Sequence, residues 1–169
     1  MRRRAILTAI LLTVPAVAGA AASTPREIVE QVYRDAGGEG GWDELFAQSM
    51  GRKRPWSREL RMVVRAADAK TQKTGEPWLD FDPVSNSQDP SVHDLKLGVA
   101  SEGGGKTSIR AEFRFGAEAD SSASRVFYDF VFEDGSWALD NIRGSIVGEK
   151  DSGWSLKKIA RDAAPARRR

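Results

Sequence analysis

The chain contains no cysteine and a single histidine among its 169 residues. The absence of cysteine excludes disulfides, thiol nucleophiles, cysteine-ligated zinc and iron–sulfur clusters. The single histidine, His93, excludes a metal site built from several histidines, and any histidine-dependent chemistry has to use this residue. The length nevertheless suits one domain of ordinary size, which buries a hydrophobic core without a disulfide or a metal.

Positive charge is also scarcer than the overall net charge of +2 suggests. Three arginines lie at positions 2–4 and three more at positions 167–169, so residues 23–166 carry 20 basic against 24 acidic side chains. A nucleic-acid-binding domain concentrates Lys and Arg to neutralise phosphates. This mildly acidic body makes nucleic acid an unexpected partner.

The N-terminal 22 residues have the three parts of a secretory signal peptide: a basic start, an apolar stretch at residues 5–17 and an A-x-A-like end at residues 18–22. An apolar stretch of this length, interrupted by Pro15, is too short to span a bilayer, which needs about 20 residues. We therefore expect residues 1–22 to be a cleaved signal peptide, residues 23–164 to form a single α+β domain in the periplasm, and residues 165–169 to be a basic disordered tail. No stable membrane insertion is expected after cleavage.

Helical signals dominate the first half of the mature chain. Thr24, Pro25 and Glu27 form the start of a helix, with an N-cap, a proline at the first position and a capping box. A short helix is predicted at residues 42–48, and a longer amphipathic helix from Ser57 to about Thr71.

Strand signals follow Pro90, since apolar and charged residues alternate at residues 109–115 and an apolar run fills residues 126–133. The latter run is expected to be a central strand, joined by a turn at Asp134-Gly135 to its partner at residues 136–143. Further elements are a first strand at residues 92–99 and a terminal helix at residues 155–160. Helices followed by an antiparallel meander predict an α+β domain with the N-terminal helices packed on one face of a curved sheet.

The segment from Trp78 to Pro90 is unusually rich in acidic and amide side chains. One interpretation is a calcium loop, although the EF-hand pattern is absent. A second interpretation is a structural loop whose Asp and Asn side chains form hydrogen bonds with their own backbone. A third interpretation places Asp82, Gln88 and Asp89 at the mouth of a pocket formed by the sheet. We assign no metal site and no cofactor.

His93 lies between two carboxylates, four residues after Asp89 and directly before Asp94. Such a neighbourhood suits a general acid or base. The alternative is a solvated or hydrogen-bonded histidine without chemistry, and no catalytic residue is assigned.

The order of the short motifs resembles a known family. The stretch Leu79–Asp89, then strands, then Trp137, Asp140, Ile142 and Arg143, then Ser155-Leu156, is similar to bacterial exported proteins grouped as domain of unknown function 3828. That family looks like a branch of the nuclear-transport-factor-2-like superfamily, so the resemblance implies a cone-shaped fold of helices and a curved antiparallel sheet, and a periplasmic location. It also allows a homodimer formed through the sheet.

Some members of that superfamily are enzymes that use an Asp with a His or Tyr in the cone, whereas many only bind small molecules or proteins. The resemblance adds Asp140 to the candidate ligand-binding residues Asp80, Asp82, Gln88, Asp89 and His93.

Three functions follow as hypotheses. The first is a binding or accessory protein that engages a small molecule, a peptide or an envelope partner through its cone or sheet. The second is a small isomerase, dehydratase or hydrolase that uses an Asp beside His93, and the third is an immunity or inhibitor protein against an envelope toxin.

Overall fold

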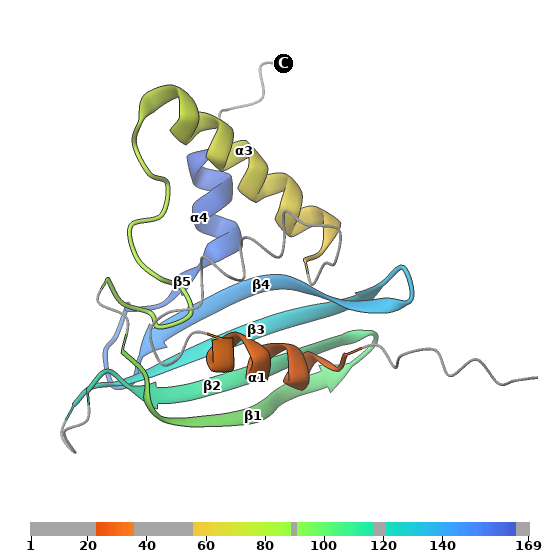
Figure 1. Cartoon of the computed structure of the whole chain (residues 1–169), viewed down its shortest axis with the longest axis vertical. Helices are drawn as coiled ribbons and strands as arrows, with labels where there is room; N and C mark the ends of the chain where they lie inside the picture. Colours follow the sequence, from red (N-terminus) through yellow and green to blue (C-terminus); the bar gives the residue numbers. More distant parts are fainter. Residues whose placement is uncertain (1–22, 36–55, 89–90, 117–120, 165–169) are drawn as a thin grey trace, which may run out of the picture.

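The computed structural model describes residues 23–35, 56–88, 91–116 and 121–164, and all structural statements below refer to these ranges. Within them, the helices are α1 (Pro25–Asp35), α3 (Arg58–Thr74) and α4 (Leu156–Ala163). The strands are β1 (His93–Gly103), β2 (Lys106–Arg114), β3 (Ala123–Glu133), β4 (Ser136–Ile146) and β5 (Trp154–Ser155). The strands pair antiparallel in the order β1-β2-β3-β4-β5, which confirms the predicted α+β class (Figure 1). The short helix predicted at residues 42–48 lies outside the described residues.

Local capping explains where the helices begin and end. In α1 the backbone amide of Thr24 donates to Glu27 Oε2 at 2.8 Å while the amide of Glu27 donates to Thr24 Oγ1 at 3.3 Å, which is the predicted capping box. In α3 the Ser57 hydroxyl accepts from the amide of Leu60. Helix α3 continues to Thr74, beyond the predicted end near Thr71, and stops at Gly75, whose φ of 75° favours glycine.

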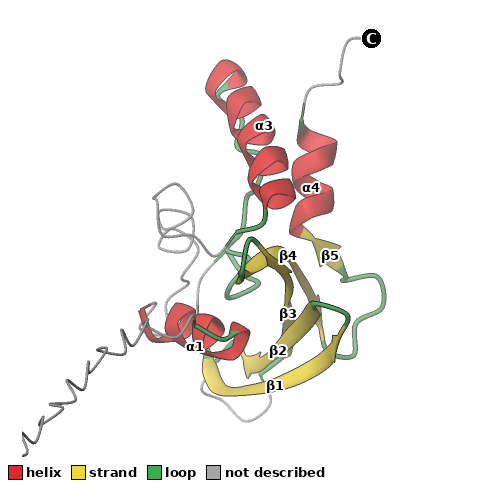
Figure 2. Ribbon diagram, turned by 90° about the vertical axis from the view of Figure 1, so that its right-hand side faces the viewer, coloured by secondary structure: helices red, strands yellow, loops and turns green. Residues whose placement is uncertain are grey.

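The sheet has two chemically different faces, because side chains alternate along each strand. On β2, Ile109, Ala111 and Phe113 are buried, whereas the residues between them are exposed or half-buried. We call the buried side the inner face and the opposite side the outer face. Figure 2 shows α1 against one side of the sheet, and the contact of Tyr33 with Phe113 identifies this side as the inner face.

Helices α3 and α4 pack against each other and rise beyond the β4 edge, as Figures 1 and 2 show. The expectation that the N-terminal helices share one face of the sheet is therefore wrong for α3. The reason is its apolar side (Leu60, Val63, Val64 and Ala67), which is buried together with Leu156 and Ala160 of α4 in one hydrophobic core. The amide of Ser57 donates to the carbonyl of Leu139 at 2.7 Å and fixes the start of α3 beside β4.

The strand boundaries also differ from the prediction. Strand β1 extends to Gly103, β2 and β3 begin earlier, at Lys106 and Ala123, and β4 continues to Ile146. The two-residue strand β5 was not predicted. The turn at Asp134-Gly135 is confirmed, with positive φ values of 51° and 78°. No helix of the described residues is long and apolar enough to cross a membrane.

Candidate functional site

Asp82 begins a tight turn that packs onto the inner face of the sheet. Its Oδ1 accepts hydrogen bonds from the backbone amides of Val84 at 2.6 Å and Ser85 at 3.3 Å. The backbones of Asp82 and Ser87 also pair in both directions, at 2.9 and 3.3 Å. Val84 and Ser85 are fully buried. The Asp82 carboxylate thus stabilises its own loop, which is the structural interpretation of this segment.

The other predicted residues near this turn lie apart from one another. Asp80 and Gln88 are exposed, and Asp89 lies outside the described residues. His93 is the first residue of β1 and pairs with Arg114 of β2. In the described part of the chain, no group of three or more His, Asp or Glu side chains is placed to hold a metal ion.

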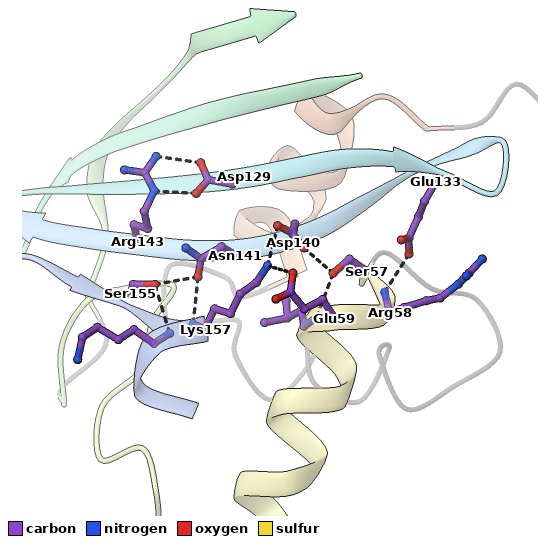
Figure 3. Close-up of polar contacts among 12 residues, drawn as sticks. Ser57, Arg58, Glu59, Asp129, Glu133, Asp140, Asn141, Arg143, Ser155 and Lys157 are labelled. Carbon is purple, nitrogen blue, oxygen red and sulfur yellow. Dashed lines mark hydrogen bonds and ion pairs between the residues drawn. The ribbon is translucent and has the colours of Figure 1, made fainter. Parts of the chain in front are cut away.

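Asp140 lies in a cluster of charged side chains that connects β4, α3 and α4, shown in Figure 3. The ammonium of Lys157 is 2.7 Å from Asp140 Oδ2 and 3.0 Å from Glu59 Oε2, and the Ser57 hydroxyl donates to Asp140 Oδ1 at 2.7 Å. Arg161 also pairs with Glu59. Only 8% of Lys157 is exposed, so the ammonium depends on these carboxylates for its solvation.

This Lys157 cluster (Ser57, Glu59, Asp140, Lys157 and Arg161) is therefore a structural joint between the helices and the sheet. The hydrogen bond from Lys157 lowers the pKa of the Glu59 carboxyl.

The sheet separates His93 from the candidate carboxylates. Two strands lie between β1 and β4, so three inter-strand spacings, about 14 Å, separate the strand of His93 from that of Asp140. Asp82 lies at the inner face, whereas His93 is on the outer face beside Arg114. These three residues therefore form no acid–base pair.

Two tyrosines meet at the inner face, Tyr33 from α1 and Tyr128 from β3, and neither is among the predicted ligand-binding residues. The Tyr128 hydroxyl donates to the Tyr33 hydroxyl at 3.1 Å, and Tyr33 donates to the carbonyl of Val84 at 3.0 Å. Burial raises the pKa of both tyrosines above the ordinary value, so both hydroxyls stay protonated at neutral pH. The sequence signal for Tyr33 is its place beside Val29 and Val32 on the apolar side of α1.

A second polar contact holds Trp154 of β5 against the same turn. Asn86 accepts from the indole Nε1 of Trp154 and donates to the Ser124 hydroxyl at 2.8 Å. The Trp154 ring also meets Phe81 edge-on, with the centroids 5.0 Å apart. The indole lies over Gly144 so closely that an added Cβ would be 2.4 Å from its Cζ2. Glycine at position 144 is therefore required by this packing.

The outer face carries a row of side chains that crosses all five strands. The register places Gly98, Arg110, Phe127, Arg143 and Ser155 side by side on β1 to β5. The guanidinium of Arg143 lies 4.8 Å from the centre of the Phe127 ring. The side chains of Arg110 and Arg143 are 47% and 44% exposed, so this part of the outer face is open to solvent. We call these five residues the outer-face row.

A hollow of about 330 Å³ adjoins the outer-face row on the side of β5 and α4. The residues that line it are Phe127, Arg143, Gly144, Ser145, Gly153, Trp154, Ser155 and Lys158. None of these described residues is acidic. The hollow therefore combines the ring of Phe127 with the cationic groups of Arg143 and Lys158. The indole of Trp154 lies on the inner face, over Gly144 and against Asn86.

The fold and this geometry define the class of the protein as α+β, with an open five-stranded antiparallel sheet and a basic and aromatic hollow on its outer face. Comparisons of the chain with family models, curated proteins and solved structures found no match. The resemblance to domain of unknown function 3828 stays a prediction.

Proposed function

We propose that this protein is exported to the periplasm and acts there as a binding or accessory protein, engaging an anionic small molecule, peptide or envelope partner through the outer face of its sheet. The observation that carries the proposal is the outer-face row, in which Phe127 stands in register between Arg110 and Arg143 and the guanidinium of Arg143 lies against its ring. Arg and aromatic side chains together are typical of binding sites, because they combine apolar contact with directed hydrogen bonds.

The inner face offers less room for a partner. Tyr33 of α1 meets Tyr128 and Phe113 edge-on, with ring centroids about 6 Å apart. The turn at residues 82–87 packs beside them through Val84, which is fully buried. These contacts fill the inner face with structural side chains and favour the outer face as the working surface.

The same proposal includes membership of domain of unknown function 3828 and a nuclear-transport-factor-2-like cone. The antiparallel sheet with α1 on one side supports this fold (Figure 2). The enzymatic hypothesis has no comparable support, because Asp82 caps its own turn and Asp140 neutralises Lys157.

Export and binding are tested separately. The full chain is expressed in a Gram-negative bacterium, and we expect it in the periplasmic fraction with an N-terminus near residue 21 or 23. Recovery of the uncleaved chain from the cytoplasm contradicts export.

For binding, the purified protein is incubated with a solubilised bacterial envelope extract and analysed by native mass spectrometry. We expect an added mass on the wild-type protein that is lost in the double variant Arg110→Gln, Arg143→Gln. The control is Lys70→Gln, Lys73→Gln, which removes the same charge from exposed positions on α3. Absence of any added mass, or equal retention by both double variants, contradicts binding through the outer face.

A further inference from the structure

The hollow beside the outer-face row has the aromatic Phe127 and the cationic Arg143 and Lys158 on its lining. We propose that this hollow is a site for a small amphiphilic anion, a carboxylate that carries an aryl or short alkyl group. The inference rests on the proposed binding function and adds the class of ligand and its place. The apolar part of the ligand contacts the ring of Phe127, and its carboxylate pairs with Arg143 and Lys158.

Arg143 is held in place before any ligand arrives. Its Nε and Nη2 donate to the two carboxylate oxygens of Asp129 at 2.6 and 2.9 Å, as Figure 3 shows, while the guanidinium lies against the Phe127 ring. These two bonds use two of the five N–H donors of an arginine, so the remaining donors are available to a second carboxylate. The hydrogen bond to Asp129 also raises the pKa of Arg143, which keeps the group charged at every physiological pH.

Lys158 provides a mobile positive charge at the edge of the hollow. Its ammonium is 2.6 Å from Asp162 Oδ2 one turn further along α4, but the two side chains are 75% and 65% exposed. An ion pair this exposed contributes little to stability, because water screens both charges. Lys158 can therefore exchange Asp162 for a ligand carboxylate at low cost. The adjacent Lys157 has no such freedom, since its ammonium is committed to Asp140 and Glu59.

The apolar part of the hollow is also fixed in place. The ring of Phe127 lies against the Arg143 guanidinium, 4.8 Å from its centre, and Gly153 adds no side chain to the lining. The indole of Trp154 lies on the opposite, inner face, where it covers Gly144 and bonds Asn86. A preformed apolar surface with a few directed polar groups is the usual form of a small-molecule site. A volume of about 330 Å³ lies at the lower end of the range for such sites and suits one ring with a short chain.

The test compares probes that differ only in charge. We titrate the purified protein with 4-phenylbutyrate, with the neutral 4-phenylbutanamide and with the cationic 4-phenylbutylamine, and follow by NMR the backbone amide resonance of Ser145, which lines the hollow. This resonance is assigned with the variant Ser145→Ala. We expect 4-phenylbutyrate to shift it and to bind at least about tenfold more tightly than the amide, as expected for hydrogen bonds to a charged group.

Variants at the edge of the hollow give the decisive comparison. Lys158→Glu is expected to reverse the preference, so that the amine binds more tightly than 4-phenylbutyrate, while the control Lys73→Glu leaves the order unchanged. Lys158 is largely exposed, so its replacement leaves the fold intact, which thermal unfolding verifies. Arg143→Gln is expected to weaken 4-phenylbutyrate by about tenfold or more.

The proposal is overturned if 4-phenylbutyrate leaves the Ser145 resonance unmoved, or if Lys158→Glu and Lys73→Glu have the same probe preference. Neither result decides the broader proposed function. If native mass spectrometry shows an added mass on the wild-type protein that the double variant Arg110→Gln, Arg143→Gln loses, binding at the outer face by a different class of partner is still supported.

Discussion

The contact between Gly144 and Trp154 leads to the sharpest prediction for this protein. In Gly144→Ala, the new Cβ would lie 2.4 to 2.6 Å from three atoms of the indole ring, where carbon atoms normally approach to about 3.5 Å. The ring has little freedom to move away, because Phe81 meets one side and its Nε1 is bonded to Asn86. The substitution therefore has to displace Trp154.

The magnitude follows from two losses. Overpacking of a fitted site costs about 1–3 kcal/mol. Loss of the hydrogen bond from Trp154 to Asn86 adds about 1 kcal/mol. We expect Gly144→Ala to lower the free energy of unfolding by about 3 kcal/mol, which for a chain of this size lowers Tm by about 6–12 °C.

Chemical denaturation followed by tryptophan fluorescence measures this effect. Gly153→Ala is the matched control, because its Cβ would meet nothing within 4 Å. The double variant Gly144→Ala, Trp154→Leu is expected to lose less stability than the sum of the two single variants, since the smaller side chain relieves the clash. The reasoning is refuted if Gly144→Ala unfolds at the same denaturant concentration as Gly153→Ala.

Three further predictions concern the Lys157 cluster and the two inner-face tyrosines. We expect Lys157→Met to lower the free energy of unfolding by about 2 kcal/mol in urea titrations, which is less than for a fully buried ion pair because Asp140 is partly exposed. An unchanged urea midpoint would contradict a stabilising role of the Lys157 cluster. The pKa of Glu59 is lowered from 4.5, so the contribution of its carboxylate to the free energy of unfolding is present above pH 4.5 and is lost as the pH falls. The difference in unfolding free energy between wild type and Glu59→Gln should therefore become smaller below pH 4.5. A difference that does not change with pH contradicts this reasoning. Tyr33→Phe should lower Tm in thermal melts more than Tyr128→Phe does, since it removes two hydrogen bonds rather than one. A larger decrease of Tm for Tyr128→Phe contradicts these hydrogen bonds.

Local signals in the sequence predicted most of the secondary structure. The capping box at Thr24 and Glu27, the turn at Asp134-Gly135 and the alternation along β2 each depend on residues a few positions apart. Strand β5 was missed because two residues carry no periodic pattern. It exists only because Ser155 and its neighbour pair with β4.

The candidate site was less predictable, because its residues come together through pairing across the sheet. Asp82 is recognisable from sequence as a turn residue, and its two amide contacts confirm that interpretation. Phe127, by contrast, belongs to an apolar run that predicts a central strand. Its position between Arg110 and Arg143 depends on the register of β2, β3 and β4.

The adjacent residues Lys157 and Lys158 show where the limit lies. The sequence alone determined that both lie in a short helix that begins after Ser155, because capping and helical spacing are local properties. Tertiary structure decided that Lys157 is buried between Asp140 and Glu59 while Lys158 stays exposed beside the hollow. The rotation of α4 about its axis makes that difference. It is set by α3, which is far away in the sequence, and by β4, because both pack apolar side chains against the helix.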